Sequence, residues 1–263
     1  MDLLDDLDAE HEALDAVVEG LRDDAWDTLT PAPGWRVRDQ IGHLAFFDQQ
    51  GYLSASDPDA FVAETADDLA DLAAFEQRAG RLGREFMGVL LLAGWRTARS
   101  LCVQALADVP DGARLPWYGP AMSVRSFATA RLMETWAHGQ DVVDGLGLGL
   151  DARPATDRLR HVAFIGASTR GWSYTVRGRE VPAGDVRVEL TLPSGALWSH
   201  GPDHAPASVR GTALDFCLVV TQRRNVADTA LVAEGALAAE WLSIAQCFAG
   251  APTMPPATGR RSA

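Results

Sequence analysis

The spacing of apolar residues changes once along the chain, and this change divides the fold into two kinds of structure. Up to about residue 150, apolar residues recur at the three- and four-residue spacing of amphipathic helices, interrupted by proline and glycine. From about residue 183 the pattern becomes the alternation of a strand, beginning with "VRVELTL". We therefore predict an α plus α+β chain, in which a four-helix bundle precedes a small α+β domain.

Proline- and glycine-rich segments mark the ends of the predicted elements. The predicted helices cover residues 2–22, 36–53, 60–107 (with an interruption near 80–83), 123–144 with Ser123 as N-cap, 156–174, 212–224 and 236–250. The predicted strands cover residues 186–192, 196–200, 208–211 and 229–235. The corresponding domains are a helical bundle over 1–152, a helical connector over 153–182, an α+β domain over 183–250 and a flexible tail over 251–263.

The composition excludes several classes of protein. A formal net charge of −13 repels phosphate backbones, so we expect no nucleic-acid partner. All 23 basic residues are arginine, which excludes the lysine of a pyridoxal-phosphate enzyme and that of a Walker A loop. No apolar run reaches the roughly 18 residues of a membrane span, and the acidic start lacks the pattern of a signal peptide. The 3 cysteines are far apart, which indicates buried thiols in a cytoplasmic protein.

The stretch "RLMETWAHGQDVVDG" carries the first candidate site. Glu134 and His138 are four residues apart in the predicted helix, so their side chains point the same way. Two interpretations fit this helix equally well. One is a solvated stripe of ion pairs that also includes Arg131 and Asp141, and the other is two thirds of a metal site.

A second helix, "RDQIGHLAFFDQQ", favours the metal site. It is apolar on most sides and contains His43, and burying an imidazole costs free energy unless its nitrogens find partners. A lone buried histidine is more often a hydrogen-bonded core residue than a ligand. Together with Glu134 and His138, however, it would complete a ligand set suited to zinc and leave the fourth position open, as in catalytic sites. Asp141 would then be a partner of one of the ligands, or else a surface residue.

Three stretches resemble the DinB/YfiT-like metalloproteins, in particular the mycothiol-dependent maleylpyruvate isomerase group. "TPAPGWRVRDQIGHL" is similar to the family's entry into the helix with the first metal histidine, and "METWAHGQDV" is similar to its Glu-x-x-x-His helix. "VRGTALDFCLVVTQRR" and "LVAEGALAAEWL" are similar to its sterol-carrier-like C-terminal domain. The segments after the second helix and over 153–179 look longer than a minimal isomerase needs, which leaves the substrate open.

The resemblance implies a site and a chemistry. It makes His43, Glu134 and His138 the ligands of one zinc ion per chain, and it suggests Arg223 or Arg224 as a catalytic arginine. Both arginines could instead cap the end of their helix. The implied partners are a small-molecule thiol, mycothiol in this family, and a small-molecule substrate, used by an isomerase or a thiol transferase. The oligomeric state stays open.

Two alternatives remain at this point. The same zinc site could activate water in a hydrolase, or the protein could bind a ligand without catalysis. The other histidines carry less information. His11 is expected at the surface, His161 fits either environment, and His200 and His204 lie in a polar loop.

Overall fold

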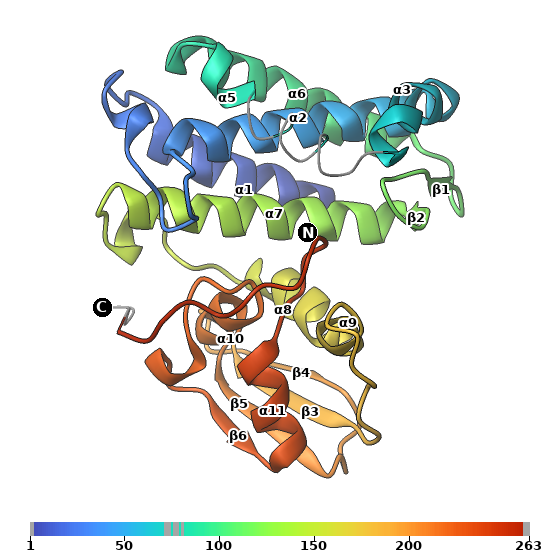
Figure 1. The fold of residues 1–263 in the computed structure, drawn as a ribbon, viewed down its shortest axis with the longest axis vertical. Coiled ribbons are helices and arrows are strands. Elements are labelled where there is room, and N and C mark those ends of the chain that lie inside the picture. The colour runs from blue at the N-terminus through green and yellow to red at the C-terminus, as the bar shows by residue number, and fades with distance from the viewer. Residues whose placement is uncertain (1–2, 71–74, 76–78, 80–81, 260–263) are drawn as a thin grey trace. The chain divides into compact units, whose positions relative to one another are not determined.

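The computed structural model describes residues 3–70, 75, 79 and 82–259, and the chain divides into two compact units at Arg153. One unit is a helical bundle and the other a small α+β domain, so the predicted fold class is confirmed (Figure 1). The finer boundaries at 152, 182 and 250 stay a prediction, and residues 260–263 of the predicted tail lie outside the described residues.

The N-terminal unit is built on four long helices. They are α1 (Leu3–Val18), α2 (Val37–Ser56), α6 (Gly88–Asp108) and α7 (Val124–Gly145). Helices α1 and α2 each pack against both α6 and α7, which closes a four-helix bundle. The shorter elements are η1 (Ala25–Asp27), α3 (Pro58–Ala70), α5 (Leu82–Glu85), β1 (Arg114–Leu115), β2 (Met122–Ser123) and η2 (Leu150–Ala152).

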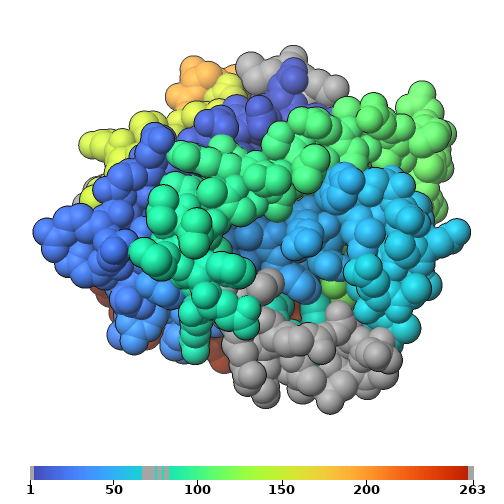
Figure 2. Space-filling model, turned by 90° about the horizontal axis from the view of Figure 1, so that it is seen from above, coloured from blue at the N-terminus to red at the C-terminus, as the bar shows by residue number. Residues whose placement is uncertain are grey.

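The hydrophobic core of the bundle follows from the helical spacing. Val37, Ile41 and Leu44 are three or four residues apart on α2, so they form one apolar face that packs with residues of α1, α6 and α7. Helices α3 and α6 form part of the surface that Figure 2 shows. The predicted helical interruption near residues 80–83 falls partly on residues 80 and 81, which lie outside the described residues.

Two local structures orient the helices that carry the candidate ligands. Helix α7 begins at the predicted N-cap, because the Ser123 hydroxyl accepts a hydrogen bond from the Ser126 backbone N–H at 3.1 Å. The loop before α2 is closed by the Thr30 N–H, which donates to the Trp35 carbonyl at 2.8 Å. Gly34 turns this loop with φ +77°, a conformation that side chains disfavour. Trp35 is thereby fixed at the start of α2.

The C-terminal unit contains one four-stranded sheet in the order β4-β3-β5-β6. The strands are β3 (Val186–Thr191), β4 (Leu197–His200), β5 (Ala207–Thr212) and β6 (Val232–Glu234). Strands β3 and β4 form the predicted antiparallel hairpin, while β3 and β5 are parallel. The apolar residues Val186, Val188 and Leu190 are buried and alternate with less buried ones, as a strand with one covered face requires.

The helices of this unit are shorter than the sequence predicts. They are α8 (Leu159–Ser168), α9 (Arg170–Thr175), α10 (Ala213–Val220) and α11 (Ala236–Ile244), with η3 (Val226–Asp228) between β5 and β6 in the chain. The predicted helix over 156–174 is therefore two helices, which meet at Thr169. Helix α10 stops before the "TQRR" segment because Gln222 turns the backbone with φ 59°. Residues 251–259 form hydrogen bonds with the rest of this unit. For example, the Asn225 side-chain amide donates to the Pro256 carbonyl.

Candidate metal centre

Three side chains of types that can ligate a metal meet where α2 faces α7. The donor atoms of His43, Glu134 and His138 all lie within 4.8 Å of one another, and no second such trio is found among the described residues. Glu134 Oε2 lies 3.0 Å from His138 Nε2 and 3.6 Å from His43 Nε2. All three side chains are half-buried. The structure thus brings together the three ligands named from the sequence, and metal binding by them stays a prediction.

The environment keeps this set ready to bind a cation. Burial, with the neighbouring His138, lowers the pKa of His43 to about 4, so its imidazole is neutral at pH 7. Burial alone would raise the pKa of Glu134, but the imidazoles of His138 and His43 outweigh it and hold the pKa well below its usual range. The site therefore presents a carboxylate next to a neutral imidazole, which is the charge state that a metal ion requires.

Aromatic rings flank the two imidazoles. Trp35 stacks on His138 with ring centroids 5.9 Å apart, and its ring lies 5.4 Å from that of His43. Phe47, one turn after His43 on α2, lies 4.6 Å from the same imidazole. Further rings extend from Phe47, including Tyr118 at 6.0 Å. The imidazoles of the candidate site therefore lie next to a cluster of aromatic side chains.

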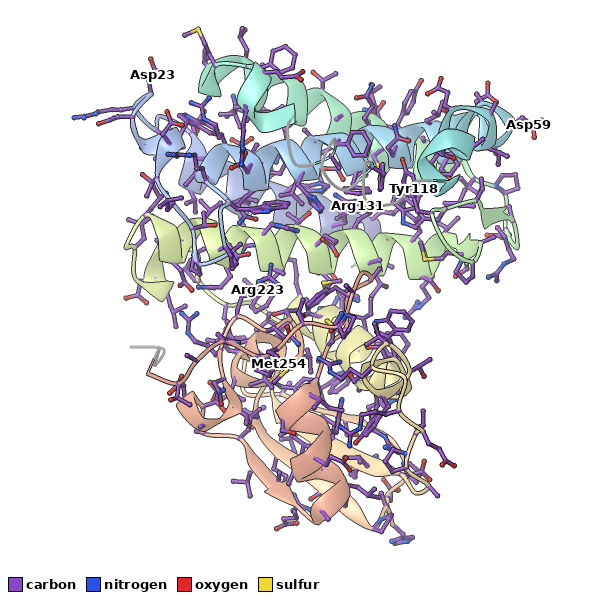
Figure 3. The ribbon with its side chains drawn as sticks, in the orientation of Figure 1. Asp23, Asp59, Tyr118, Arg131, Arg223 and Met254 are labelled. Atoms are coloured by element: carbon purple, nitrogen blue, oxygen red, sulfur yellow. The ribbon has the colours of Figure 1, made fainter. Side chains whose placement is uncertain are left out.

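A buried ion pair links the two helices beyond the site. Arg131, one turn before Glu134, points from α7 toward α2 (Figure 3), and its Nε donates to Asp48 Oδ1 at 2.9 Å. Trp95 Nε1 of α6 donates to the other oxygen of Asp48 at 3.0 Å. Both charged side chains are almost completely buried, at 4% and 0% exposure. Asp48 was not among the residues predicted from the sequence, although its position on a helix that is apolar on most sides was a signal.

The burial of α7 contradicts one interpretation of its sequence. Arg131 and Asp141 are buried, and Glu134 and His138 are half-buried, so these residues do not form a solvated stripe. The expectation for His11 is also wrong, because its side chain is fully buried against Trp95 in the bundle. The reason is that α1 contributes a residue to the bundle interior at every turn.

The remaining predicted residues lie in the C-terminal unit. Arg223 and Arg224 follow the end of α10, where both backbone N–H groups donate to the Leu218 carbonyl, at 2.7 and 3.1 Å. Arg224 is buried and Arg223 half-buried. His161 is half-buried on α8. Of the two histidines predicted in a polar loop, His200 lies on β4 and stacks on Trp198, and His204 is exposed. No described helix is long and apolar enough to cross a membrane.

Comparison with known proteins identifies relatives over the whole chain. The family model described as the mycothiol maleylpyruvate isomerase N-terminal domain matches residues 7–143. An uncharacterized protein of Mycobacterium tuberculosis, found in two strains, is 45% identical over 255 residues, which are 97% of this chain and 96% of that protein.

Solved structures share the fold at low sequence identity. A crystal structure of the mycothiol-dependent maleylpyruvate isomerase matches with a TM-score of 0.55 and 12% identity, covering 89% of this chain and 93% of the other. A single-residue mutant of the enzyme of that name matches with a TM-score of 0.57 and 14% identity, covering 85% and 90%. At this identity, the likeness shows a common fold.

Proposed function

Because the chain belongs to the mycothiol maleylpyruvate isomerase family, we propose that it is an enzyme that holds one zinc ion between His43, Glu134 and His138 and uses a small thiol as its nucleophile. The observation that carries this proposal is the convergence of three donor atoms within 4.8 Å of one another on two facing helices. Family membership supports a reaction of the isomerase or thiol-transferase type.

The geometry of the three residues suits zinc. Around a tetrahedral ion with bonds near 2.1 Å, ligand atoms lie roughly 3.4 Å apart. Glu134 Oε2 lies 3.0 Å from one imidazole nitrogen and 3.6 Å from the other, close to that spacing. Three protein ligands leave one coordination position for a small molecule, which is typical of catalytic zinc. When bound, zinc would favour the thiolate form of a thiol in that position.

The chain's own cysteines are unsuited to act as the nucleophile. Cys102, Cys217 and Cys247 are all buried, and none of them belongs to the trio of donor atoms. Burial raises the pKa of the Cys102 and Cys217 thiols far above the ordinary value, so both stay protonated at pH 7. A thiolate at this site has to come from a bound thiol, and the family supports mycothiol as that thiol.

The residues around the trio define what a substrate would meet. Trp35 and Phe47 present apolar faces beside the imidazoles and limit the access of water to the reacting sulfur. Charge interactions are stronger in such a poorly solvated environment. His43 and His138 stay neutral as ligands, so Glu134 supplies the only negative charge of the ligand set.

The reaction type determines the fate of the carbon–sulfur bond. In an isomerase, the thiolate adds to one carbon of a cis double bond, the resulting single bond rotates, and elimination of the same thiolate restores the double bond as trans. In a transferase, the thiolate displaces a leaving group and the carbon–sulfur bond persists. Both need an electrophilic carbon next to the bound thiol, and an unsaturated acid meets this requirement for the first.

An arginine would recognise the carboxylate of such an acid. The "TQRR" segment offers Arg223 and Arg224, whose planar guanidinium groups can bind a carboxylate through two hydrogen bonds. Replacing the functional one with glutamine should raise KM for an unsaturated acid much more than for its uncharged ester. If both variants keep the KM ratio of the wild type, neither arginine binds the carboxylate.

Metal content is the first test of the proposal. Elemental mass spectrometry of the purified protein, at a measured protein concentration, should find about one zinc per chain, and the His138→Ala variant should lose it. His204→Ala is the matched control, because His204 is exposed in the C-terminal unit and outside the trio. A wild-type protein that takes up no zinc on reconstitution would falsify the metal site.

Thiol binding is the second test. In cobalt-substituted protein, mycothiol should add a sulfur-to-cobalt absorption band, and the band should be absent in the His138→Ala variant. Glutathione serves as the comparison thiol and should bind more weakly. A protein that binds cobalt but shows no spectral response to any thiol contradicts the thiol proposal, and a hydrolytic reaction at the same site would then fit better. We also propose that the protein is cytoplasmic, and cell fractionation should then find it in the cytosol.

A further inference from the structure

A buried amide lies beside one of the candidate ligands. Gln40 is on α2, three residues before His43, and its side chain is completely buried, at 0% exposure. Its Oε1 forms a hydrogen bond with Nδ1 of His138, the ring nitrogen that faces away from Glu134. Its Nε2 donates to the Thr30 hydroxyl oxygen at 2.8 Å. Gln40 therefore connects the imidazole of α7 to the loop before α2.

The loop before α2 determines the orientation of the Gln40 amide group. The Thr30 hydroxyl donates its only hydrogen to the Trp35 carbonyl at 3.0 Å, so the hydroxyl oxygen is left to accept. Only the NH₂ end of Gln40 can donate to that oxygen, which turns the carbonyl end toward His138. Since a carbonyl oxygen accepts and cannot donate, His138 has to carry a hydrogen on Nδ1.

In a neutral imidazole, this assignment leaves a lone pair on the other nitrogen of His138. Nε2 then faces Glu134 Oε2 across 3.0 Å, with no hydrogen of a neutral imidazole between them. Two acceptors at that distance repel each other unless a positive charge, a proton or a metal ion, lies between them. The imidazole with hydrogen on Nδ1 and a free Nε2 is the form that binds a metal through Nε2.

We propose that Gln40, oriented by Thr30 and the Trp35 carbonyl, is a positioning residue that holds His138 in the tautomer and ring orientation needed to bind zinc through Nε2. This inference rests on the proposed metal site. It assigns a role to a residue outside the ligand set, and it gives a reason for the hydrogen bonds that connect the loop before α2, through Gln40, to α7. A neutral amide orients the ring without adding a second negative charge to the site.

Variants of Gln40 separate its hydrogen bond from its bulk. Gln40→Met keeps the length of the side chain and removes the acceptor, so the zinc dissociation constant should rise about 10- to 100-fold. Gln40→Glu keeps an acceptor for the Nδ1–H group and should bind zinc much more tightly than Gln40→Met. The measurement is competition for zinc with a chromogenic chelator at constant pH, with circular dichroism to show that each variant is folded.

A variant of Thr30 tests the orientation of the amide without changing Gln40 itself. Thr30→Val removes the acceptor that holds the NH₂ end of Gln40, and the loss of one such hydrogen bond corresponds to about a 2- to 12-fold rise in the zinc dissociation constant. Two substitutions of the same kind serve as controls. Gln140→Met removes a buried amide on α7 that donates to Asp144, and Thr65→Val removes a hydroxyl on α3 that donates to Phe61. Neither control should change zinc affinity.

Nuclear magnetic resonance tests the tautomer directly. In the zinc-loaded protein, long-range proton–nitrogen correlations should show hydrogen on Nδ1 of His138 and none on Nε2. The reverse assignment overturns the inference, as does a folded Gln40→Met variant with wild-type zinc affinity. If Gln40→Met does not fold, the affinity of Thr30→Val decides. A wild-type protein that binds no zinc overturns the metal site itself, which distinguishes that failure from the failure of the Gln40 assignment.

Discussion

The buried pair between Asp48 and Arg131 gives the sharpest prediction about stability. Arg131→Met removes the guanidinium and keeps much of the side-chain length. Asp48 then retains the hydrogen bond from Trp95 Nε1 at 3.0 Å, and it loses the hydrogen bond from Arg131 Nε at 2.9 Å and the ion-pair contact with Arg131 Nη2 at 2.8 Å. Solvent does not reach Asp48, so water cannot replace the lost partner. His11 Nε2 lies 3.8 Å from the carboxylate, but burial lowers the pKa of His11 to about 4, so at pH 7 the charge of Asp48 stays buried and uncompensated.

The expected loss is large for a single substitution. Removing one partner of a buried ion pair typically costs about 3–5 kcal/mol in free energy of unfolding, against a total of about 5–15 kcal/mol for a native protein. The reverse change, Asp48→Asn, leaves Arg131 buried and should cost a similar amount. In the double variant neither charge is stranded, so its loss should be about 2–3 kcal/mol smaller than the sum of the two single losses.

Urea unfolding followed by far-ultraviolet circular dichroism measures these losses, since the bundle contributes the long helices. Glu19→Gln is the control, because it removes an ion-pair partner of Arg96 that is exposed, and it should change the unfolding free energy very little. Losses that add within about 0.5 kcal/mol in the double variant would refute the reasoning, because additivity means that the two charges do not interact.

Three further changes follow from packing, burial and metal binding. In Gly88→Ala the new methyl carbon would lie 2.3 Å from Trp26 Nε1, and calorimetry should show a loss of about 1–3 kcal/mol, whereas Gly94→Ala on the same helix meets no atom within 4 Å and should gain up to about 1 kcal/mol. Burial lowers the pKa of His11 to about 4 from 6.5, so the unfolded chain binds more protons between these values and the fold loses stability as pH falls through them. Urea titrations should show that the wild type loses up to about 3 kcal/mol more than His11→Leu over that interval, and equal losses would contradict the assignment. At a free zinc concentration of about 100 times the dissociation constant, chelation should lower Tm by about 5–10 °C, and the His138→Ala variant should show no shift.

Local pattern was sufficient to predict the elements that carry the candidate site. The stretch "RDQIGHLAFFDQQ" predicted that α2 is a largely buried helix, and Ser123 marked the start of α7; which residues of α2 form its core face, Val37, Ile41 and Leu44 among them, was seen only in the structure. The four-residue separation of Glu134 and His138 placed both side chains on one face of their helix, because 3.6 residues complete a turn. These features depend on neighbours within one or two turns, so the sequence contains the information that sets them.

The same local reasoning could not decide how the polar residues of different helices pair. On its own helix, Asp48 has no visible partner, and its contact with Arg131 joins positions 83 residues apart. His11 was predicted to be exposed because its neighbours in the sequence are acidic, but its position on α1 places it inside the bundle, against Trp95. The helix over 212–224 was predicted too long. Gln222 ends it with a left-handed backbone conformation, and a glutamine in the sequence gives no indication of such a turn.

The amino-acid sequence by itself determined the helices, the strands, the fold class and the types of side chain available for a metal site. Only the tertiary structure decided that Gln40 meets His138 from 98 positions away, that Thr30 orients Gln40, and that three donor atoms converge on one point. The physical reason is that a hydrophobic period specifies which face of a helix is buried. The partner of each buried polar group depends on the rotation and register of the neighbouring helix, which the packing of the whole bundle sets.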